Sequence, residues 1–228
     1  MAALHIPRVR LGTQGFEVSK LGFGCMGLTG SYGDPVADEV GISVIKHAFS
    51  KGITFFDTAD LYGANNANEI LVGKALKEVP REKVQVATKF GIIANNGNFT
   101  DIQVKGSPEY VRSCCEASLK RLDVEYIDLY YQHRVDKSVP IEDTVSEFSF
   151  YMCPLGRGFF GGKVVVETLP ANSSLKSYPR FQAENLEKNK NIYNRIESIG
   201  KKHECSAAQL ALAWVLHQGN DVVPIPGE

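Results

Sequence analysis

Short apolar runs alternate with amphipathic segments along the first 145 residues of the chain. The amphipathic segments repeat their apolar residues every three or four positions, as a helix packed on one side does, and the apolar runs have the length of buried strands. Strand followed by helix, with short links, predicts right-handed β-α-β units and a parallel sheet. The units take about 35 residues each, and their strands are Leu21–Met26, Ile53–Phe56, Val84–Ala87 and Tyr126–Gln132.

Residues typical of helix ends mark the helices between these strands. A helix is expected from about Asp38 to Lys51. Asn66 and Glu69 have the spacing of a capping box, so the second helix should open there. The third helix should begin at Ser107-Pro108 and end near Leu122. Outside these units we expect a β-hairpin and a polar loop, at residues 8–22 and 95–106 respectively.

The second half of the chain departs from this repeat. Residues 140–145 look like the start of a fourth helix, but a strand-like run over 148–154 follows at once and ends in a glycine-rich turn. The elements expected after it are a helix over 185–202, a helix opened by the capping box of Ser206 and Gln209 and closed by Gly219, and a last strand and turn over 222–227.

Composition limits the class of protein. The chain has 228 residues, of which 43% are hydrophobic, and a formal charge of −1. This charge argues against an electrostatic grip on nucleic acid or an anionic membrane. The N-terminus lacks the apolar core of a signal peptide, and the longest apolar stretch, 207–216, is too short to span a bilayer. We therefore expect one domain, over residues 1–228, in the cytoplasm.

The five cysteines show neither a CxxC pair nor the spacing of metal ligands. They are expected to be free thiols in a reducing compartment, and no metal site is predicted.

Four reactive side chains stand just past the predicted strands or in the loops after them, and they are Asp57, Tyr62, Lys89 and His133. A parallel barrel brings such positions together on one face. A carbonyl reductase needs a proton donor at the carbonyl oxygen, and tyrosine suits this role only if its pKa, ordinarily about 10, is lowered. A lysine ammonium lowers it, a carboxylate fixes the lysine, and a histidine polarises the carbonyl.

Gly22-Phe-Gly-Cys-Met-Gly27 matches the GxGxxG pattern of dinucleotide-binding folds. That pattern requires a helix to begin at its third glycine and point its N-terminus at a pyrophosphate. The residues that follow, Leu-Thr-Gly-Ser-Tyr-Gly-Asp-Pro at 28–35, cannot begin a helix. A Rossmann fold is therefore not expected.

The segments around the four reactive residues resemble the aldo-keto reductases. Gly-Ile-Thr-Phe-Phe-Asp57-Thr-Ala-Asp-Leu-Tyr62-Gly is similar to the family segment that carries the catalytic aspartate and tyrosine. Val-Ala-Thr-Lys89-Phe-Gly resembles its lysine strand, and Ile-Asp-Leu-Tyr-Tyr-Gln-His133-Arg its histidine strand. Residues 8–135 match without interruption, and they look most like the plant NADPH-dependent members of the perakine reductase and auxin-induced type.

The resemblance implies an α/β fold of the (β/α)8 TIM-barrel family with an N-terminal β-hairpin, and NADPH or NADP as cofactor. It implies that Asp57, Tyr62, Lys89 and His133 are catalytic. The run Cys-Pro-Leu-Gly-Arg-Gly-Phe resembles the loop that wraps the cofactor pyrophosphate. The cofactor contacts implied in this way are Met26, Asp57, Pro154, Leu155, Gly156, Arg157, Gly158, Phe159 and Gly227.

The chain is too short for the whole barrel. Residues 8–145 correspond to an intact first half, whereas residues 146–228 supply only part of the second. Against eight units, about 80 residues are missing between the two parts. Strands five and six, most of strand seven and the final helix are absent from the resemblance. Because barrel closure ties strand number to tilt and stagger, such a loss should leave an open sheet edge.

The function expected from the resemblance is NADPH-dependent reduction of a small aldehyde or ketone to an alcohol, with Tyr62 as the proton donor. Two alternatives stay open. One is a non-catalytic remnant that does not hold the cofactor. The other is a binding module, since potassium-channel β-subunits share the fold and the four residues while serving as partners. Such a module would associate with itself or with full-length homologues through the open edge.

Overall fold

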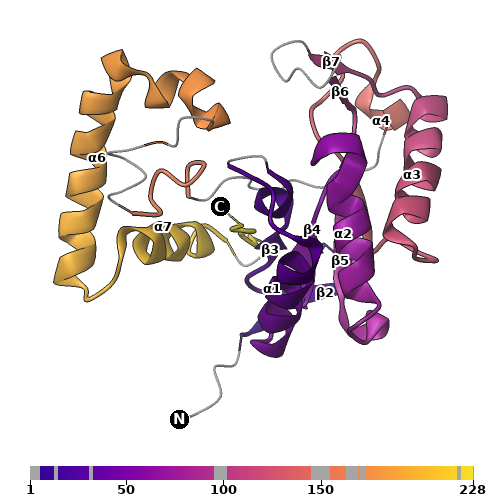
Figure 1. Ribbon diagram of the computed structural model, residues 1–228, viewed down its shortest axis with the longest axis horizontal. Helices are drawn as coiled ribbons and strands as arrows, with labels where there is room; N and C mark the ends of the chain where they lie inside the picture. Colours follow the sequence, from indigo (N-terminus) through magenta and orange to yellow (C-terminus); the bar gives the residue numbers. More distant parts are fainter. Residues whose placement is uncertain are drawn as a thin grey trace.

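The computed structural model of the chain describes residues 6–12, 15–30, 33–94, 102–144, 155–162, 169, 173–219 and 222–227. Its centre is a parallel sheet in the order β3-β4-β5-β8 (Figure 1). These strands are Phe23–Gly24, Phe55–Asp57, Gln85–Phe90 and Leu129–Gln132. Neighbouring strands pair in parallel register, for example Asp57 with Ala87 and Lys89 with Tyr131. The predicted α/β class and the parallel sheet are therefore confirmed.

Three helices cover one face of this sheet (Figure 1). They are α1 (Asp38–Ser50), α2 (Ala67–Leu76) and α3 (Pro108–Leu122), and α2 contacts both of its neighbours. Phe56 and Val86 point from the strands into the apolar core beneath them. A Cβ at Gly73 would lie 2.4 Å from the carbonyl oxygen of Leu122, so glycine lets α2 and α3 approach closely.

The opposite face of the sheet holds a second core, closed by the N-terminal hairpin. The hairpin consists of β1 (Arg8–Leu11) and β2 (Phe16–Ser19), paired antiparallel as the sequence predicted. Phe55 and Ala87 point into this core, because alternate residues of a strand face opposite sides. The hairpin thus covers the interior that a barrel would enclose.

The segment 222–227 extends the sheet beside β3. Gly22 and Gly24 donate backbone hydrogen bonds to Pro224 and Pro226, in parallel register. Val223 and Ile225 pack into the second core. A Cβ at Gly227 would lie 1.7 Å from the Gly24 carbonyl oxygen, so this contact requires glycine. The last segment of the chain therefore lies next to the first parallel strand, as in a closed barrel.

The C-terminal part is helical and has a core of its own. It contains η5 (Ser174–Ser177), η6 (Pro179–Phe181), α6 (Ala183–Lys202) and α7 (Ala207–Leu216). Phe159, Phe181 and Tyr193 belong to its apolar core. The Ser206–Gln209 capping box is present at the start of α7. The Gly219 cap is not, because α7 ends at Leu216 and the backbone N–H of His217 bonds the last turn.

Two other local expectations differ from the structure. The predicted polar loop includes a strand, since β7 (Ile102–Val104) pairs antiparallel with β6 (Ile92–Ala94). Asn66 does not cap α2 with its side chain; it has φ 60° and donates instead to the carbonyl of Asp60. The expected start of a fourth helix is confirmed as the single turn α4 (Ile141–Thr144), whereas the strand-like run over 148–154 lies outside the described residues.

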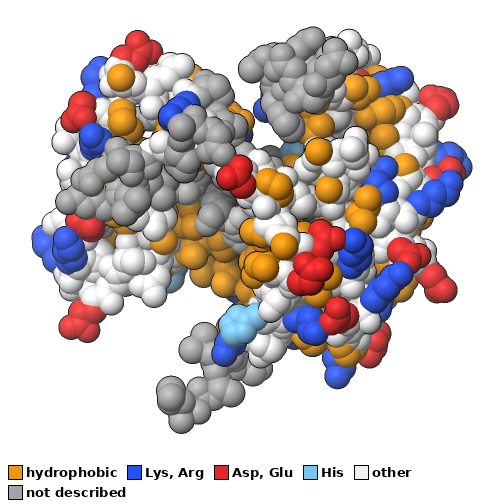
Figure 2. All heavy atoms as spheres, viewed as in Figure 1, with side chains coloured by type: hydrophobic (Ala, Val, Ile, Leu, Met, Phe, Trp, Pro, Cys, Tyr) orange, Lys and Arg blue, Asp and Glu red, His pale blue; other side chains and the backbone are white. Residues whose placement is uncertain are grey.

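Some apolar surface stays exposed. In the described part of the chain, β8 pairs only with β5, so its other edge has no described strand beside it. Helix α7 is almost entirely apolar, yet Trp214 on it is 66% exposed. Apolar side chains gather at the centre of the face in Figure 2, at the level of α7. None of the described helices is long and apolar enough to cross a membrane.

Candidate active site

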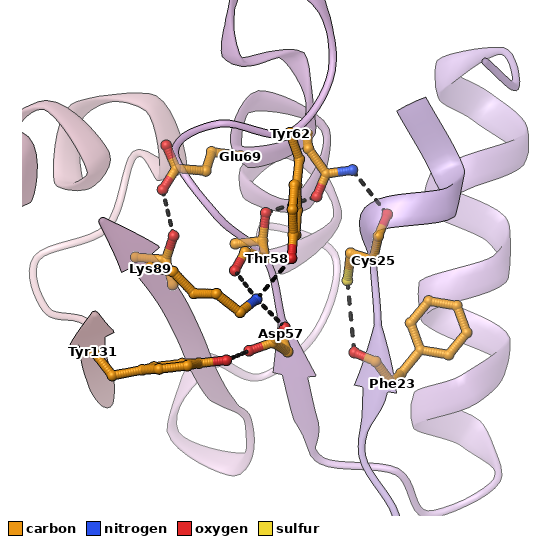
Figure 3. A network of polar contacts seen from close by, with 10 residues as sticks. Phe23, Cys25, Asp57, Thr58, Tyr62, Glu69, Lys89 and Tyr131 are labelled. Atoms are coloured by element: carbon orange, nitrogen blue, oxygen red, sulfur yellow. Dashed lines mark hydrogen bonds and ion pairs between the residues drawn. The ribbon is translucent and has the colours of Figure 1, made fainter. Parts of the chain in front are cut away.

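The four predicted reactive side chains come together at the carboxyl ends of the parallel strands. Asp57 ends β4, Lys89 lies near the end of β5, and His133 directly follows β8. Tyr62 reaches the same place from the loop after β4. Backbone bonds continue the strand pairing beyond the strand ends, from Thr58 to Ala87 and from His133 to Phe90, and so fix where these loops leave the sheet. Part of the resulting network is drawn in Figure 3.

Lys89 lies at the centre of this network and is completely buried. Its ammonium donates to Asp57 Oδ1, to the carbonyl oxygen of Thr58 at 2.8 Å and to Tyr62 Oη at 3.1 Å. An ammonium has three N–H groups, so all of them are directed. Burial alone would lower the pKa of Lys89, but the charge of Asp57 and the hydroxyls of Tyr131 and Tyr62 raise it well above its ordinary value. The lysine is therefore a fixed positive charge beside the Tyr62 oxygen.

Asp57 uses both of its carboxylate oxygens. Oδ1 accepts from Lys89, and Oδ2 accepts from the hydroxyl of Tyr131 (Figure 3). Burial raises the pKa of Asp57, while the charge of Lys89 and the hydrogen bonds from Lys89 and Tyr131 oppose this. The sequence reasoning missed Tyr131. Strand alternation was the available signal, because Tyr131 is two residues before His133 and so faces the same side.

His133 lies edge-on to Tyr62, with ring centroids 5.5 Å apart. Burial, together with the charges of Lys89 and Arg134, lowers the pKa of His133 to about 3. The imidazole is therefore neutral at ordinary pH. Its Nδ1 atom is buried and has no hydrogen-bond partner in the described structure. A neutral imidazole next to the tyrosine ring can direct a hydrogen bond without adding a second charge.

The loop that carries Tyr62 is held by Asn68, in the first turn of α2. The buried Asn68 side chain accepts from Thr58 Oγ1 at 2.6 Å and donates to the Cys25 carbonyl and to Thr29 Oγ1. The backbone N–H of Asn68 donates to the carbonyl of Tyr62. One amide thus ties the loops after β3 and β4 to the start of α2.

The next residue, Glu69, supports the lysine strand from the other side of the sheet. Its carboxylate accepts from Thr88 Oγ1 and pairs with Arg121 of α3. Glu69 was expected to cap α2, but its side chain points to β5 instead. Because Thr88 directly precedes Lys89, this bond fixes the strand where the lysine emerges.

A further buried carboxylate, Asp60, lies in the loop between Asp57 and Tyr62. It is 8% exposed, and its Oδ1 atom has no hydrogen-bond partner among the described residues. Burial and the charge of Glu69 raise its pKa to about 7, against the opposing charges of Arg121 and Lys89. The loop therefore carries a carboxyl group that is easier to bury protonated than ionised.

This shift predicts a pH dependence of stability. A carboxyl whose folded pKa is about 7 and whose ordinary value is 3.8 stabilises the fold below pH 4, and that contribution is lost as pH rises through 7. At 1.36 kcal/mol per pKa unit the loss is at most about 4 kcal/mol. Asp60→Asn should remove it, so urea unfolding at pH 8 should show a more stable variant, and at pH 4 little difference.

Asp143→Asn, at an exposed position, is the matched control and should change stability at neither pH. An Asp60→Asn variant whose difference from the wild type is the same at pH 4 and pH 8 would contradict the assignment.

The residues expected to contact a cofactor occupy two places. Asp57 is itself one of the four reactive residues. Met26 (in η1, Met26–Thr29) and Gly227 lie at the ends of adjacent strands on the same side of the sheet edge. The loop residues, by contrast, lie with the C-terminal helices, where Leu155 and Phe159 are buried. Pro154 lies outside the described residues. The loop residues described are Leu155, Gly156, Arg157, Gly158 and Phe159.

The backbone of this loop is left-handed over three residues. Gly156, Arg157 and Gly158 have φ values of 66°, 62° and 79°, a left-handed conformation that glycine adopts without strain. Arg180 donates to the Gly156 carbonyl, and the Arg157 guanidinium stacks 4.2 Å from the Tyr178 ring centroid. Glycines at such positions let a ligand approach the backbone closely.

Comparison with known proteins supplies the family context. A model of the aldo/keto reductase family matches residues 20–151 and 148–228. A probable aldo-keto reductase 1 of Glycine max is 59% identical over 286 aligned positions, covering 100% of this chain and 82% of that protein. A glycerol dehydrogenase of Gluconobacter oxydans has a TM-score of 0.78 at 25% identity, covering 100% of this chain and 87% of that one. An aldo-keto reductase of Bacillus halodurans, in its holo form, has a TM-score of 0.72 at 23% identity, covering 98% and 87%.

The alignment also measures what is missing inside the chain. Its 286 positions exceed the 228 residues by 58, so at least 58 positions of the Glycine max protein have no counterpart here. The family model matches in two segments that meet at residues 148–151. The discontinuity in the family match therefore falls where the sequence pattern departs from its repeat, and the unmatched positions total at least 58 over the whole alignment, against about 80 expected from unit length.

Proposed function

Since this chain belongs to the aldo/keto reductase family, we propose that it reduces an aldehyde or ketone to the alcohol with NADPH, and that Tyr62 supplies the proton. By family it is an oxidoreductase that acts on small carbonyl compounds, and the family uses nicotinamide cofactors. The observation that carries the proposal is the bond from the buried Lys89 ammonium to Tyr62 Oη. It places a fixed positive charge where a phenolate must form.

Each of the four residues has one part in the chemistry. The nicotinamide, when bound, supplies hydride to the carbonyl carbon. Tyr62 transfers its proton to the carbonyl oxygen, so the product is the neutral alcohol and the tyrosine is left as phenolate. The Lys89 ammonium stabilises that phenolate, and Asp57 holds the lysine. Neutral His133 orients the carbonyl oxygen by a hydrogen bond.

The residues for the cofactor fit it at two ends. Asp57 and Met26 would lie beside the nicotinamide, Gly227 would begin the loop on the adenosine side, and the loop from Leu155 to Phe159 would bind the pyrophosphate. The left-handed backbone of Gly156, Arg157 and Gly158 supports this role for the loop, since glycines there let phosphate oxygens approach the main chain closely. The Arg157 charge adds attraction for the same group.

The finer assignments belong to the same proposal. NADPH rather than NADH and the plant perakine reductase or auxin-induced subtype are proposed from the resemblance over residues 8–135. The cytoplasm as location is a proposal as well. The identity to the Glycine max protein supports a plant-type enzyme.

The test is NADPH consumption by the purified full chain with a panel of aldehydes and ketones, followed by absorbance and by identification of the alcohol. Turnover above the rate without a carbonyl compound, lost in Tyr62→Phe, supports the proposal. A chain that binds NADPH yet reduces no member of the panel contradicts it.

The gap in the chain favours one second candidate, a non-catalytic partner of full-length homologues. The edge of β8 with no described strand beside it and the exposed apolar surface of α7 are the features that such a partner would cover. Co-purification of a tagged chain with a full-length relative, without NADPH-dependent turnover, would favour this function over the first.

A further inference from the structure

Tyr131 contacts the reactive group without having a part in the chemistry proposed above. It lies on the inner side of β8, its hydroxyl donates to Asp57 Oδ2 at 2.5 Å, and its ring centroid is 5.4 Å from Lys89 Nζ. We propose that Tyr131 is a positioning residue: by binding the second oxygen of Asp57, it keeps the Lys89 ammonium shared between Asp57 and the Tyr62 hydroxyl. This inference rests on the proposed function of the site.

The negative charge of Asp57 is shared between Lys89 and Tyr131. A carboxylate has two oxygens and binds an ammonium more strongly when nothing else shares its charge. The Tyr131 hydroxyl withdraws part of that charge, since hydrogen bonds to an ionised carboxylate stabilise it. Lys89 is then held less tightly by Asp57 and is a better donor to Tyr62. The hydroxyl on β8 therefore acts on Tyr62 through two intermediate groups.

The same contact fixes the direction of the carboxylate. Lys89 approaches Asp57 from β5, and Tyr131 approaches it from β8, so donors from two strands hold the two oxygens. A carboxylate bound at only one oxygen could rotate and change the Lys89 position. Because Lys89 also donates to the Thr58 carbonyl, its remaining N–H direction towards Tyr62 depends on where Asp57 stands.

The groups that titrate near this carboxylate come from each surrounding element. They are Cys25 after β3, Tyr62 after β4, Lys89 on β5 and Tyr131 on β8, with His133 beyond Tyr62. Burial and the charge of Asp57 raise the pKa of the Cys25 thiol, and burial likewise raises that of Tyr131, so both stay protonated near neutral pH. Tyr62 is thus the group whose titration reports on the hydroxyl of Tyr131.

The neighbouring residue provides a matched control. Tyr130 is on the same strand but faces the opposite side of the sheet, where it stacks on Phe90 with centroids 4.8 Å apart. Its hydroxyl lies 3.4 Å from the Val111 carbonyl oxygen, away from Asp57. Tyr130→Phe and Tyr131→Phe therefore delete the same atom from adjacent positions, and only the second touches the carboxylate.

The experiment is a pH titration of the full chain with 13C-labelled tyrosine, followed by NMR. Tyr62→Phe identifies the Tyr62 resonance. In Tyr131→Phe we expect Tyr62 to titrate about 0.5–1 pH unit higher than in the wild type, the size of one hydrogen bond's net contribution. Tyr130→Phe should leave that titration unchanged. An unchanged Tyr62 titration in Tyr131→Phe, or an equal shift in Tyr130→Phe, overturns the proposal.

A second variant covers the case in which Tyr131→Phe does not fold. Site-specific 3-fluorotyrosine at position 131 keeps the ring and makes its hydroxyl a stronger donor. It should move the Tyr62 titration to lower pH, and a shift to higher pH or none overturns the proposal. Neither measurement needs NADPH or a carbonyl compound. Failure of the reductase function would appear as missing turnover, whereas failure of this inference would appear as an unmoved titration.

Discussion

Lys89→Met is expected to lower the free energy of unfolding by about 3–5 kcal/mol, the cost of leaving a buried charge without its partner. Lys89 is 0% exposed and Asp57 is 3% exposed, so water cannot replace the missing ammonium at the carboxylate. Methionine keeps most of the apolar stem and removes the charge together with three hydrogen bonds. Urea unfolding of the wild type and of Lys89→Met at pH 7 measures the effect.

The double variant Lys89→Met with Asp57→Asn should recover part of this loss, because the orphan charge is then gone while an amide can still meet Tyr131. Lys120→Met, at an exposed position of α3, is the control for charge removal and should change stability by less than about 0.5 kcal/mol. If Lys89→Met lowers the free energy of unfolding no more than Lys120→Met does, Lys89 and Asp57 do not form a buried ion pair.

Tyr62→Phe should lower kcat for carbonyl reduction by about 10²–10⁴-fold, the usual contribution of a positioned general acid. The variant keeps the aromatic ring, which is 7% exposed and lies edge-on to His133, so the fold should be preserved. NADPH binding should be almost unchanged, because the hydroxyl acts on the carbonyl oxygen. Steady-state kinetics, together with quenching of NADPH fluorescence, separate the two effects.

The control here is Tyr126→Phe, which removes a hydroxyl from an exposed tyrosine that stacks on Arg81 and precedes β8, at the opposite end of the strand from His133. It should retain wild-type kcat. If Tyr62→Phe keeps kcat within about threefold of the wild type, another group donates the proton and the role of Tyr62 is wrong.

The sequence was sufficient for the parallel sheet and for the grouping of Asp57, Tyr62, Lys89 and His133. The reason is topological: strand C-termini of β-α units share one edge, so residues that follow separate strands converge whatever their side-chain contacts. The hairpin over residues 8–22 and the Ser206 cap were equally local signals, and both are present.

Contacts that depend on the opposite side chain were not predictable in this way. Asn66 and Glu69 have capping-box spacing, but their side chains bind elsewhere. Asn66 donates to the Asp60 carbonyl. Glu69 accepts from Thr88 and pairs with Arg121. The hydroxyl of Tyr131 has no distinct sequence signal until Asp57 is known to lie opposite it. Local propensity is a weak prior where a buried partner competes for the same group.

The positions of the family that have no counterpart in this chain affect its parts unequally. The contact of residues 222–227 with β3 restores one side of a barrel, and β8 ends the described sheet on the other. Because the four reactive residues all lie on β4, β5, β8 and the loops between them, their geometry does not depend on the missing strands. The loop proposed to bind the cofactor, residues 155–159, follows the discontinuity, so we expect the gap to affect cofactor binding most.

Thermal unfolding of the purified chain with and without NADPH tests most directly whether the chain binds the cofactor. A ligand bound only by the folded state, at about 100 times its Kd, adds roughly 2.7 kcal/mol, which is about 5–10 °C in Tm for a domain of this size. We predict one cooperative transition that moves up by this amount, in the wild type and in Tyr62→Phe alike. A cooperative transition that NADPH does not move would contradict the proposed reductase.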